Sequence, residues 1–221
     1  MRIEVMANVM DKNEQLAQQT KKVLDDRGIF MVNLLGSPGS GKTSLLEQTI
    51  AMLKNELRLA VIEGDLFTAK DAERLKGFEI PVVQINTHGG CHLNAAMVNK
   101  ALAAFNLAEL DLLFVENVGN LVCPAEFSLG EDVKVTVLSI SEGEDKPLKY
   151  PLIFKQSAVV ILNKLDLLPY TPYNLTATVE DLISINPSIS VVKASCRTGE
   201  GLADWYDWLR CQVERKQHRR E

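Results

Sequence analysis

The chain has 221 residues, of which 46% are hydrophobic and 24% are charged, and its formal net charge is −5. This size suits one α/β domain with a sizeable core, and the acidic balance argues against a nucleic-acid-binding protein, which needs a basic face. No apolar run reaches the roughly 18 residues of a membrane span, and residues 1–22 lack the apolar core of a signal peptide. We therefore expect a cytoplasmic protein without a membrane partner, whose four cysteines are reduced thiols or metal ligands.

The elements alternate from the start of the chain. An amphipathic pattern over residues 8–27 predicts an N-terminal helix that ends at Gly28. A strand over 29–35 leads through a glycine-rich loop to a helix over 42–56. Strands over 59–63, 81–85 and 112–115 then alternate with helices over 68–76 and 92–105.

The second half continues this alternation. Apolar runs at 133–140 and 158–162 are followed by a helix over 176–185, a strand over 189–193 and a helix over 201–215. Continuous Val/Ile/Leu runs are typical of strands buried on both faces. The pattern predicts a three-layer α/β fold, with a mostly parallel sheet between helices. We expect residues 1–221 to form a single domain, with the helix of residues 1–28 packed on it.

The glycine-rich loop has the sequence Gly36-Ser37-Pro38-Gly39-Ser40-Gly41-Lys42-Thr43, followed by Ser44. It lies between a predicted strand and a predicted helix, which is the context of a P-loop. The glycines allow backbone N–H groups to turn toward phosphates, and the helix N-terminus adds positive charge. We expect Lys42 to neutralise the β- and γ-phosphates and the Thr43 hydroxyl to bind Mg²⁺. The motif predicts a P-loop NTPase.

Two acidic residues follow neighbouring predicted strands, where such sheets bind ligands. Asp65 and Glu116 are therefore candidate Mg²⁺ ligands together with Thr43. The residues leave open whether Asp65 binds the metal or orients the attacking water. Glu116-Asn117-Val118-Gly119 resembles the Asp-x-x-Gly switch of GTPases, in which the glycine N–H touches the γ-phosphate. Lys42, Asp65, Glu116 and Gly119 are thus the candidate catalytic residues.

A predicted strand runs into Asn163-Lys164-Leu165-Asp166. In GTPases the aspartate of this motif accepts hydrogen bonds from the guanine N1–H and the 2-amino group, which adenine lacks. The next strand ends at Ser195-Cys196-Arg197, which resembles the Ser-Ala-Lys loop that packs on the base. Asn163, Lys164, Asp166, Ser195, Cys196 and Arg197 are therefore predicted to bind GTP. The replacement of lysine by Arg197 leaves open whether this side chain stacks on the base.

Cys91-His92 is placed at a predicted helix start, and Cys123 follows the switch-like segment. Two thiolates and an imidazole suit Ni²⁺ or Zn²⁺, and a two-fold dimer would complete the ligand set. From the residues alone, buried cysteines that only pack are the simpler interpretation.

Several of these motifs together resemble the hydrogenase nickel-incorporation GTPases (the HypB family), which belong to the signal-recognition-particle and MinD-related class of P-loop NTPases. The resemblance covers essentially the whole chain. It rests on the P-loop, Glu63-Gly64-Asp65, Asp71-Ala72-Glu73-Arg74, Cys91-His92-Leu93, Asn163-Lys164-Leu165-Asp166 and, most specifically, Glu116-Asn117-Val118-Gly119-Asn120-Leu121-Val122-Cys123-Pro124-Ala125.

The resemblance implies a GTP-dependent homodimer that delivers Ni²⁺ to [NiFe]-hydrogenase large-subunit precursors with a small zinc-containing partner protein. It also implies a Ni²⁺ or Zn²⁺ site formed by Cys91, His92 and Cys123 near the dimer interface. Some family members carry a Cys- or His-rich N-terminal extension. The chain begins Met1-Arg2-Ile3 without one, so we do not expect tight nickel storage. Ser37 stands where MinD-type ATPases carry an extra lysine.

Two alternatives compete with this interpretation. One is a GTPase of the same class that serves another metalloenzyme, of the urease accessory or cobalamin-dependent mutase chaperone type, although the metal motifs of those families differ. The other is a P-loop small-molecule kinase. A kinase would need an arginine-rich lid, which this sequence lacks, and it would leave Asn163 to Asp166 unexplained.

Overall fold

A computed structural model describes residues 5–66 and 70–219. Its centre is a seven-stranded sheet in the order β3-β2-β4-β1-β5-β6-β7, in which every neighbouring pair is parallel. The sequence predicted a mostly parallel sheet, and the sheet of the described residues is parallel throughout. The strands are β1 (Phe30–Leu35), β2 (Leu59–Asp65), β3 (Val82–Asn86), β4 (Leu112–Glu116), β5 (Val133–Ser139), β6 (Ser157–Asn163) and β7 (Ser190–Lys193).

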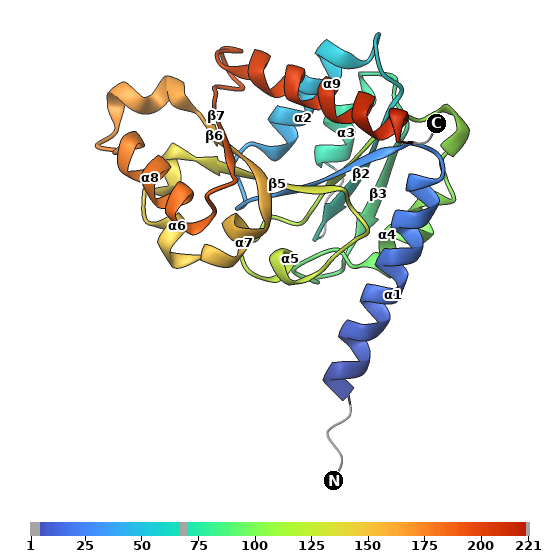
Figure 1. Ribbon diagram of the computed structural model, residues 1–221. Coiled ribbons are helices and arrows are strands. Elements are labelled where there is room, and N and C mark those ends of the chain that lie inside the picture. Colours follow the sequence, from blue (N-terminus) through green and yellow to red (C-terminus); the bar gives the residue numbers. More distant parts are fainter. Residues whose placement is uncertain (1–4, 67–69, 220–221) are drawn as a thin grey trace.

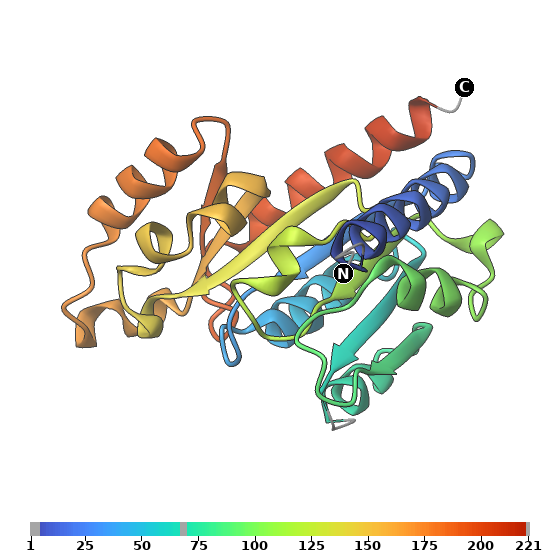
Figure 2. The ribbon, with the colours of Figure 1, turned by 90° about the horizontal axis from the view of Figure 1, so that it is seen from below.

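Helices cover both faces of this twisted sheet, which confirms the predicted three layers (Figures 1 and 2). One face packs against α2 (Lys42–Leu53), α3 (Lys70–Lys76) and α9 (Leu202–His218). The other face is covered by α1 (Val5–Asp25), α4 (Ala95–Leu102), α5 (Cys123–Glu126), α7 (Pro151–Gln156) and α8 (Leu175–Ile185). The short α6 (Lys146–Lys149) lies beside α7 and α8.

Side-chain alternation along the strands explains the two apolar layers. Val32 and Leu34 of β1 face α2 and α9, whereas Met31 faces α1 and α4. These side chains on both faces of β1 are fully buried. The sequence of such a strand is therefore a nearly continuous apolar run and does not alternate with polar residues. Among the described residues, no helix has the length and apolar composition that crossing a bilayer requires.

Two element predictions need correction. The helix predicted over 92–105 begins only at Ala95, because the Asn94 side chain accepts a hydrogen bond from Met97 N (3.0 Å) and caps it. Cys91 and His92 therefore lie in a loop and not at a helix start. Asp65 is the last residue of β2 and does not follow it. The helix predicted over 68–76 is α3, and residues 68 and 69 lie outside the described part of the chain.

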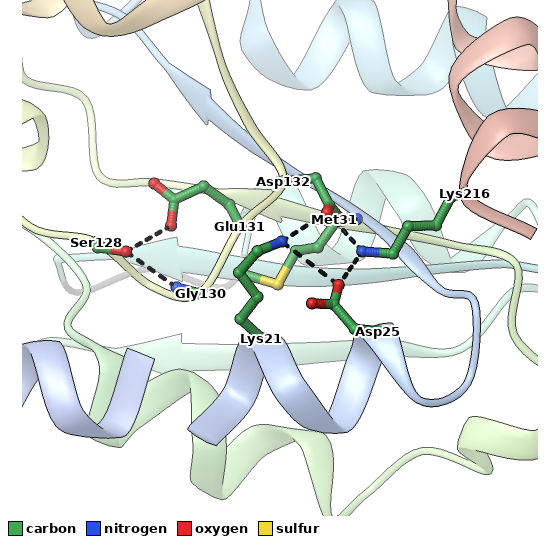
Figure 3. Close-up of polar contacts among 8 residues, drawn as sticks. All are labelled: Lys21, Asp25, Met31, Ser128, Gly130, Glu131, Asp132 and Lys216. Atoms are coloured by element: carbon green, nitrogen blue, oxygen red, sulfur yellow. Dashed lines mark hydrogen bonds and ion pairs between the residues drawn. The ribbon is translucent and has the colours of Figure 1, made fainter. Parts of the chain in front are cut away.

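A polar cluster ties α1 and α9 to the loop before β5 (Figure 3). Asp132 of that loop accepts from Lys21 of α1 (2.9 Å) and from Lys216 of α9 (2.5 Å), and its second oxygen accepts from Met31 N (2.9 Å). Lys216 also pairs with Asp25 of α1, and its side chain is only 10% exposed. The cluster fixes both helices at the amino ends of the central strands β1 and β5, opposite to the P-loop end of β1.

Candidate functional site

The P-loop connects β1 to α2, as its motif predicted. Gly41 precedes α2 with φ 103°, a left-handed conformation that favours glycine. A Cβ on Gly41 would lie 2.2 Å from Nδ2 of Asn163, the last residue of β6. Only glycine at this position therefore leaves room for the end of β6 beside the P-loop. The backbone carbonyls of Gly36 and Ser37 each accept a hydrogen bond from Lys42 Nζ at 3.3 Å. The lysine thus lies folded over the loop.

Thr43 and Glu116 contact each other across the floor of this site. The Thr43 hydroxyl donates to Oε1 of Glu116 at 2.8 Å, which brings the end of β4 to the first turn of α2. Burial raises the pKa of Glu116 to about 7, against the lowering effect of Lys42 and Thr43. Burial also lowers the pKa of Lys42, and Glu116 is the strongest group that opposes this shift. The Glu116 carboxylate thus favours the charged form of Lys42, and Lys42 favours the charged form of Glu116.

Glu63 lines the phosphate cavity as well, although its place in the sequence did not single it out as a candidate site residue. In the parallel register of β2 and β4, Glu63 lies directly beside Glu116, and its side chain is only 2% exposed. Burial and, next, the charge of Glu116 raise the pKa of Glu63 to about 8. The signal was present in the Glu63-Gly64-Asp65 motif, but only the strand register shows that Glu63 turns toward the phosphate site.

A cavity of about 450 Å³ collects most of the predicted phosphate-site residues. Its lining includes Pro38, Gly39, Gly41, Lys42, Thr43, Ser44, Glu63, Asp65, Glu116 and Gly119. Gly119 touches the P-loop so closely that a Cβ would lie 2.8 Å from Pro38 N. The predicted switch glycine thus faces the phosphate loop.

The donor set at the floor of this cavity fits Mg²⁺. Within the described residues, Oε2 of Glu63 and Oε2 of Glu116 are buried without a hydrogen-bond partner. Hard cations of this kind prefer carboxylate and hydroxyl oxygens, and Thr43 and Asp65 add further oxygen donors to the same cavity. A cation would compensate the buried carboxylates, which otherwise carry an uncompensated desolvation penalty.

An adjoining cavity of about 410 Å³ is lined by the predicted base-recognition residues other than Ser195: Asn163, Lys164, Asp166, Cys196 and Arg197. The two cavities adjoin because Gly41, Ser44 and Lys164 line both. Asn163 braces this region, donating to Ser40 O (3.0 Å) and accepting from Cys196 N (3.0 Å). Lys164 has a left-handed backbone (φ 66°), and its Nζ donates to Gly39 O at 2.7 Å.

The Asp166 carboxylate is oriented by the loop of residues 195–197, the second predicted base-binding segment. Its Oδ1 accepts from the buried Ser195 hydroxyl at 2.6 Å, and its Oδ2 lies 3.8 Å from the guanidinium of Arg197. The Arg197 side chain is otherwise exposed to solvent. Burial raises the pKa of Cys196 to about 11, so this thiol packs as a neutral group in the loop.

The three predicted soft-metal ligands also come together. One donor atom from each of Cys91, His92 and Cys123 lies within 4.8 Å of the others. A hydrogen bond with Cys123, followed by burial, raises the pKa of the Cys91 thiol. The His92 ring stacks on Phe127 with centroids 4.0 Å apart, and burial lowers the His92 pKa. The lowered pKa favours the neutral imidazole, which is the form that binds metal.

Comparisons with known proteins place this site in a family. Residues 30–193 match the family model of the CobW/HypB/UreG nucleotide-binding domain. The hydrogenase maturation factor HypB of Azotobacter vinelandii is 48% identical over 95% of this chain and 69% of its own length.

Two solved structures extend the comparison. The structure of HypB from Helicobacter pylori in complex with nickel superposes with a TM-score of 0.85 at 34% identity, covering 95% of this chain and 97% of that one. The signal recognition particle receptor FtsY of Elizabethkingia anophelis has a TM-score of 0.55 at 16% identity over 88% of this chain and 67% of its own, a likeness in fold alone. The P-loop, the strand order and these matches agree: the chain belongs to the CobW/HypB/UreG family of nucleotide-binding proteins and, within it, to the HypB hydrogenase maturation factors.

Proposed function

We propose that the protein is a GTP-hydrolysing nickel metallochaperone that acts in the cytoplasm on [NiFe]-hydrogenase large-subunit precursors, together with a small zinc-containing partner. Its GTP-dependent homodimerisation is coupled to the metal site of Cys91, His92 and Cys123. One observation carries the proposal: a single short segment holds both Glu116, in contact with Thr43, and Cys123, seven positions later, beside Cys91 and His92.

In this proposal, residues that line the two adjoining cavities bind the nucleotide. Lys42 neutralises the β- and γ-phosphates, and the Gly119 N–H contacts the γ-phosphate. Thr43, Glu116 and Asp65 hold Mg²⁺, which supplies charge neutralisation for the phosphates when bound. Asp65 either ligates this ion or orients the attacking water. Asp166 selects guanine, because its carboxylate pairs with donors that adenine lacks.

Nickel is the cargo of the protein in this proposal, carried by the site of Cys91, His92 and Cys123. Cys91, His92 and Cys123 offer three soft or borderline donors, which suit Ni²⁺ or Zn²⁺ better than a hard cation. Cys91 is exposed, so its thiol is open toward a second chain. A two-fold dimer would bring two such sets together and complete the coordination with ligands from both copies. The similar HypB structure from Helicobacter pylori is a complex with nickel, which supports nickel as the cargo here.

Hydrolysis acts in this scheme as a switch for metal affinity. The γ-phosphate orders the segment after Glu116, and the same segment carries Cys123. Release of the phosphate lets the segment relax and changes the spacing between Cys123 and Cys91. The nucleotide state therefore sets the affinity for the metal.

The test is a titration of the protein with Ni²⁺ and with Zn²⁺, in the presence of GDP and of a non-hydrolysable GTP analogue. Oligomeric state is followed by sedimentation in the same samples. Cys123→Ala is expected to lose most of the nickel affinity in both nucleotide states. Cys211→Ala, which removes the partly exposed thiol of α9, serves as the matched control and should behave as wild type. Equal nickel affinity of the wild type in the two nucleotide states would overturn the proposal.

A further inference from the structure

Residues 87–93, called here the Cys-His loop, are anchored by hydrogen bonds to segments that form the phosphate site. Thr87 N donates to the carbonyl of Asp65 at 2.9 Å. Leu93 N donates to Oδ1 of Asn117 at 2.9 Å. The carbonyl of Cys91 accepts from Nδ2 of Asn120 at 3.4 Å. The last two anchors are side chains of one segment, residues 116–120, which begins at Glu116.

Asn117 is the buried member of this pair, with a side chain that is 1% exposed. Its Oδ1 accepts from both Leu93 N and Val118 N (3.0 Å), and its Nδ2 donates to Oδ1 of Asn33 at 3.2 Å. Asn33 in turn donates to Glu131 Oε1 at 3.2 Å, and Glu131 lies next to Asp132 in the loop before β5. The amide oxygen of Asn117 is therefore held in place from β1, while it links the switch-like segment to the Cys-His loop.

Asn120 makes the second link and touches the P-loop directly. Its backbone N donates to Gly36 O at 3.0 Å, the same carbonyl that accepts from Lys42 Nζ. Its side chain donates to Cys91 O and accepts from Val122 N at 2.9 Å. A single residue thus connects the first P-loop glycine, the Cys91 backbone and the residue before Cys123.

We infer that Asn117 and Asn120 are the positioning residues that transmit the state of the phosphate site to the spacing between Cys91-His92 and Cys123. The inference rests on the proposed function and adds the route of its coupling. Two donors share one Asn117 oxygen, so a shift of Val118 N toward a phosphate changes the bond that holds Leu93. A shift of Gly36 moves Asn120, and with it the Cys91 carbonyl. Buried hydrogen bonds of this kind transmit displacement because breaking them without replacement is costly.

The route is tested at Asn120, which is only half-buried and whose side chain does not line the phosphate cavity. Asn120→Asp keeps the acceptor for Val122 N but loses the donor to Cys91 O, and Asn120→Ala loses both. Asn106→Asp is the matched control, because Asn106 is exposed and its side chain also accepts from the backbone N two residues later (Ala108, 3.3 Å). Asn117 itself is too buried for a clean test, since its replacement endangers folding.

The readout is the ratio of the nickel dissociation constants measured with GDP and with a non-hydrolysable GTP analogue. Coupled sites typically give a ratio of about fivefold or more, which we expect for wild type and Asn106→Asp. Both Asn120 variants are expected to reduce the ratio to about one, the value of uncoupled sites, while GTP hydrolysis without metal and the urea midpoint stay near wild type. A merely structural role would lower stability and leave the ratio intact.

The outcomes distinguish the route from the coupling that it serves. If the ratio of nickel dissociation constants is about fivefold or more in wild type and stays so in both Asn120 variants, the route through Asn120 is wrong and the proposed function stands. If the ratio is about one in wild type, the proposed coupling itself fails and the route fails with it.

Discussion

At the residue scale, the buried pair of Glu63 and Glu116 is the most informative feature of the phosphate site. Two carboxyl groups stand side by side in neighbouring strands, and each keeps one oxygen unpaired among the described residues. An apolar pair would fill the same space without the desolvation penalty. The buried pair therefore supports the proposal that Glu116 helps to hold a Mg²⁺ ion that accompanies the nucleotide.

The raised pKa of Glu63 predicts a pH-dependent stability. The folded-state pKa of about 8 exceeds the ordinary glutamate value of 4.5, so the folded protein binds this proton more tightly than the unfolded chain. Its contribution to stability is complete below pH 4.5 and is lost as pH rises through 8. Glu63→Gln removes the titration, so the metal- and nucleotide-free variant should gain stability over wild type at about pH 8.5 and gain less at about pH 5.5. Urea unfolding at both values measures this, and an equal difference at the two would contradict it.

The Asp166 carboxylate predicts a change in base preference. Asp166→Asn replaces an acceptor that faces the guanine N1–H and 2-amino group with a group that is also a donor. GTP binding should weaken by about two orders of magnitude or more, while xanthosine triphosphate, with a carbonyl at position 2, should bind better than GTP. Fluorescent-nucleotide competition measures both affinities. Asp207→Asn, a change at a 75% exposed side chain on α9, is the control that should leave them unchanged.

At the scale of elements, the strands follow from the sequence and several helix boundaries do not. Continuous apolar runs locate all seven strands within about two residues, because burial on both faces demands them. The short helices α5, α6 and α7 carry too few residues for a periodic pattern, and their positions depend on tertiary packing. Helix α4 begins at Ala95 and not at residue 92, because Asn94 caps its first turn. The prediction followed the apolar residues of this region and did not weigh Asn94 as a cap.

The attachment of α1 and α9 through Asp132 predicts a stability effect. Asp132→Ala leaves Lys216 with Asp25 alone and removes the acceptor of Met31 N. The loss should be about 2 kcal/mol in free energy of unfolding, because a largely buried lysine and a backbone N–H lose a partner together. Asp207→Ala breaks the exposed ion pair with Arg210 and should cost well under about 1 kcal/mol. Urea denaturation compares the two, and equal effects would argue against a structural role for the cluster.

At the scale of the whole molecule, the sequence indicated where the candidate nucleotide and metal sites lie, but not which contacts connect these sites. The P-loop and Asn163-to-Asp166 are contiguous motifs whose position after a strand fixes their place in the fold. The residues alone left the group of Cys91, His92 and Cys123 open, because two separate loops must meet to form it, and the family resemblance made it the stronger prediction. The Glu63–Glu116 pair and the Asn117 and Asn120 links depend on strand register and loop packing, which spacing in the sequence does not encode.

The central claim is that the nucleotide and metal sites are thermodynamically linked, and linkage is reciprocal. The most direct test measures the affinities for GDP and for a non-hydrolysable GTP analogue on metal-free and on nickel-loaded protein. Reciprocity predicts that nickel changes the ratio of these two nucleotide affinities by the same factor by which the nucleotide changes the nickel affinity. An identical nucleotide ratio with and without nickel would contradict the linkage.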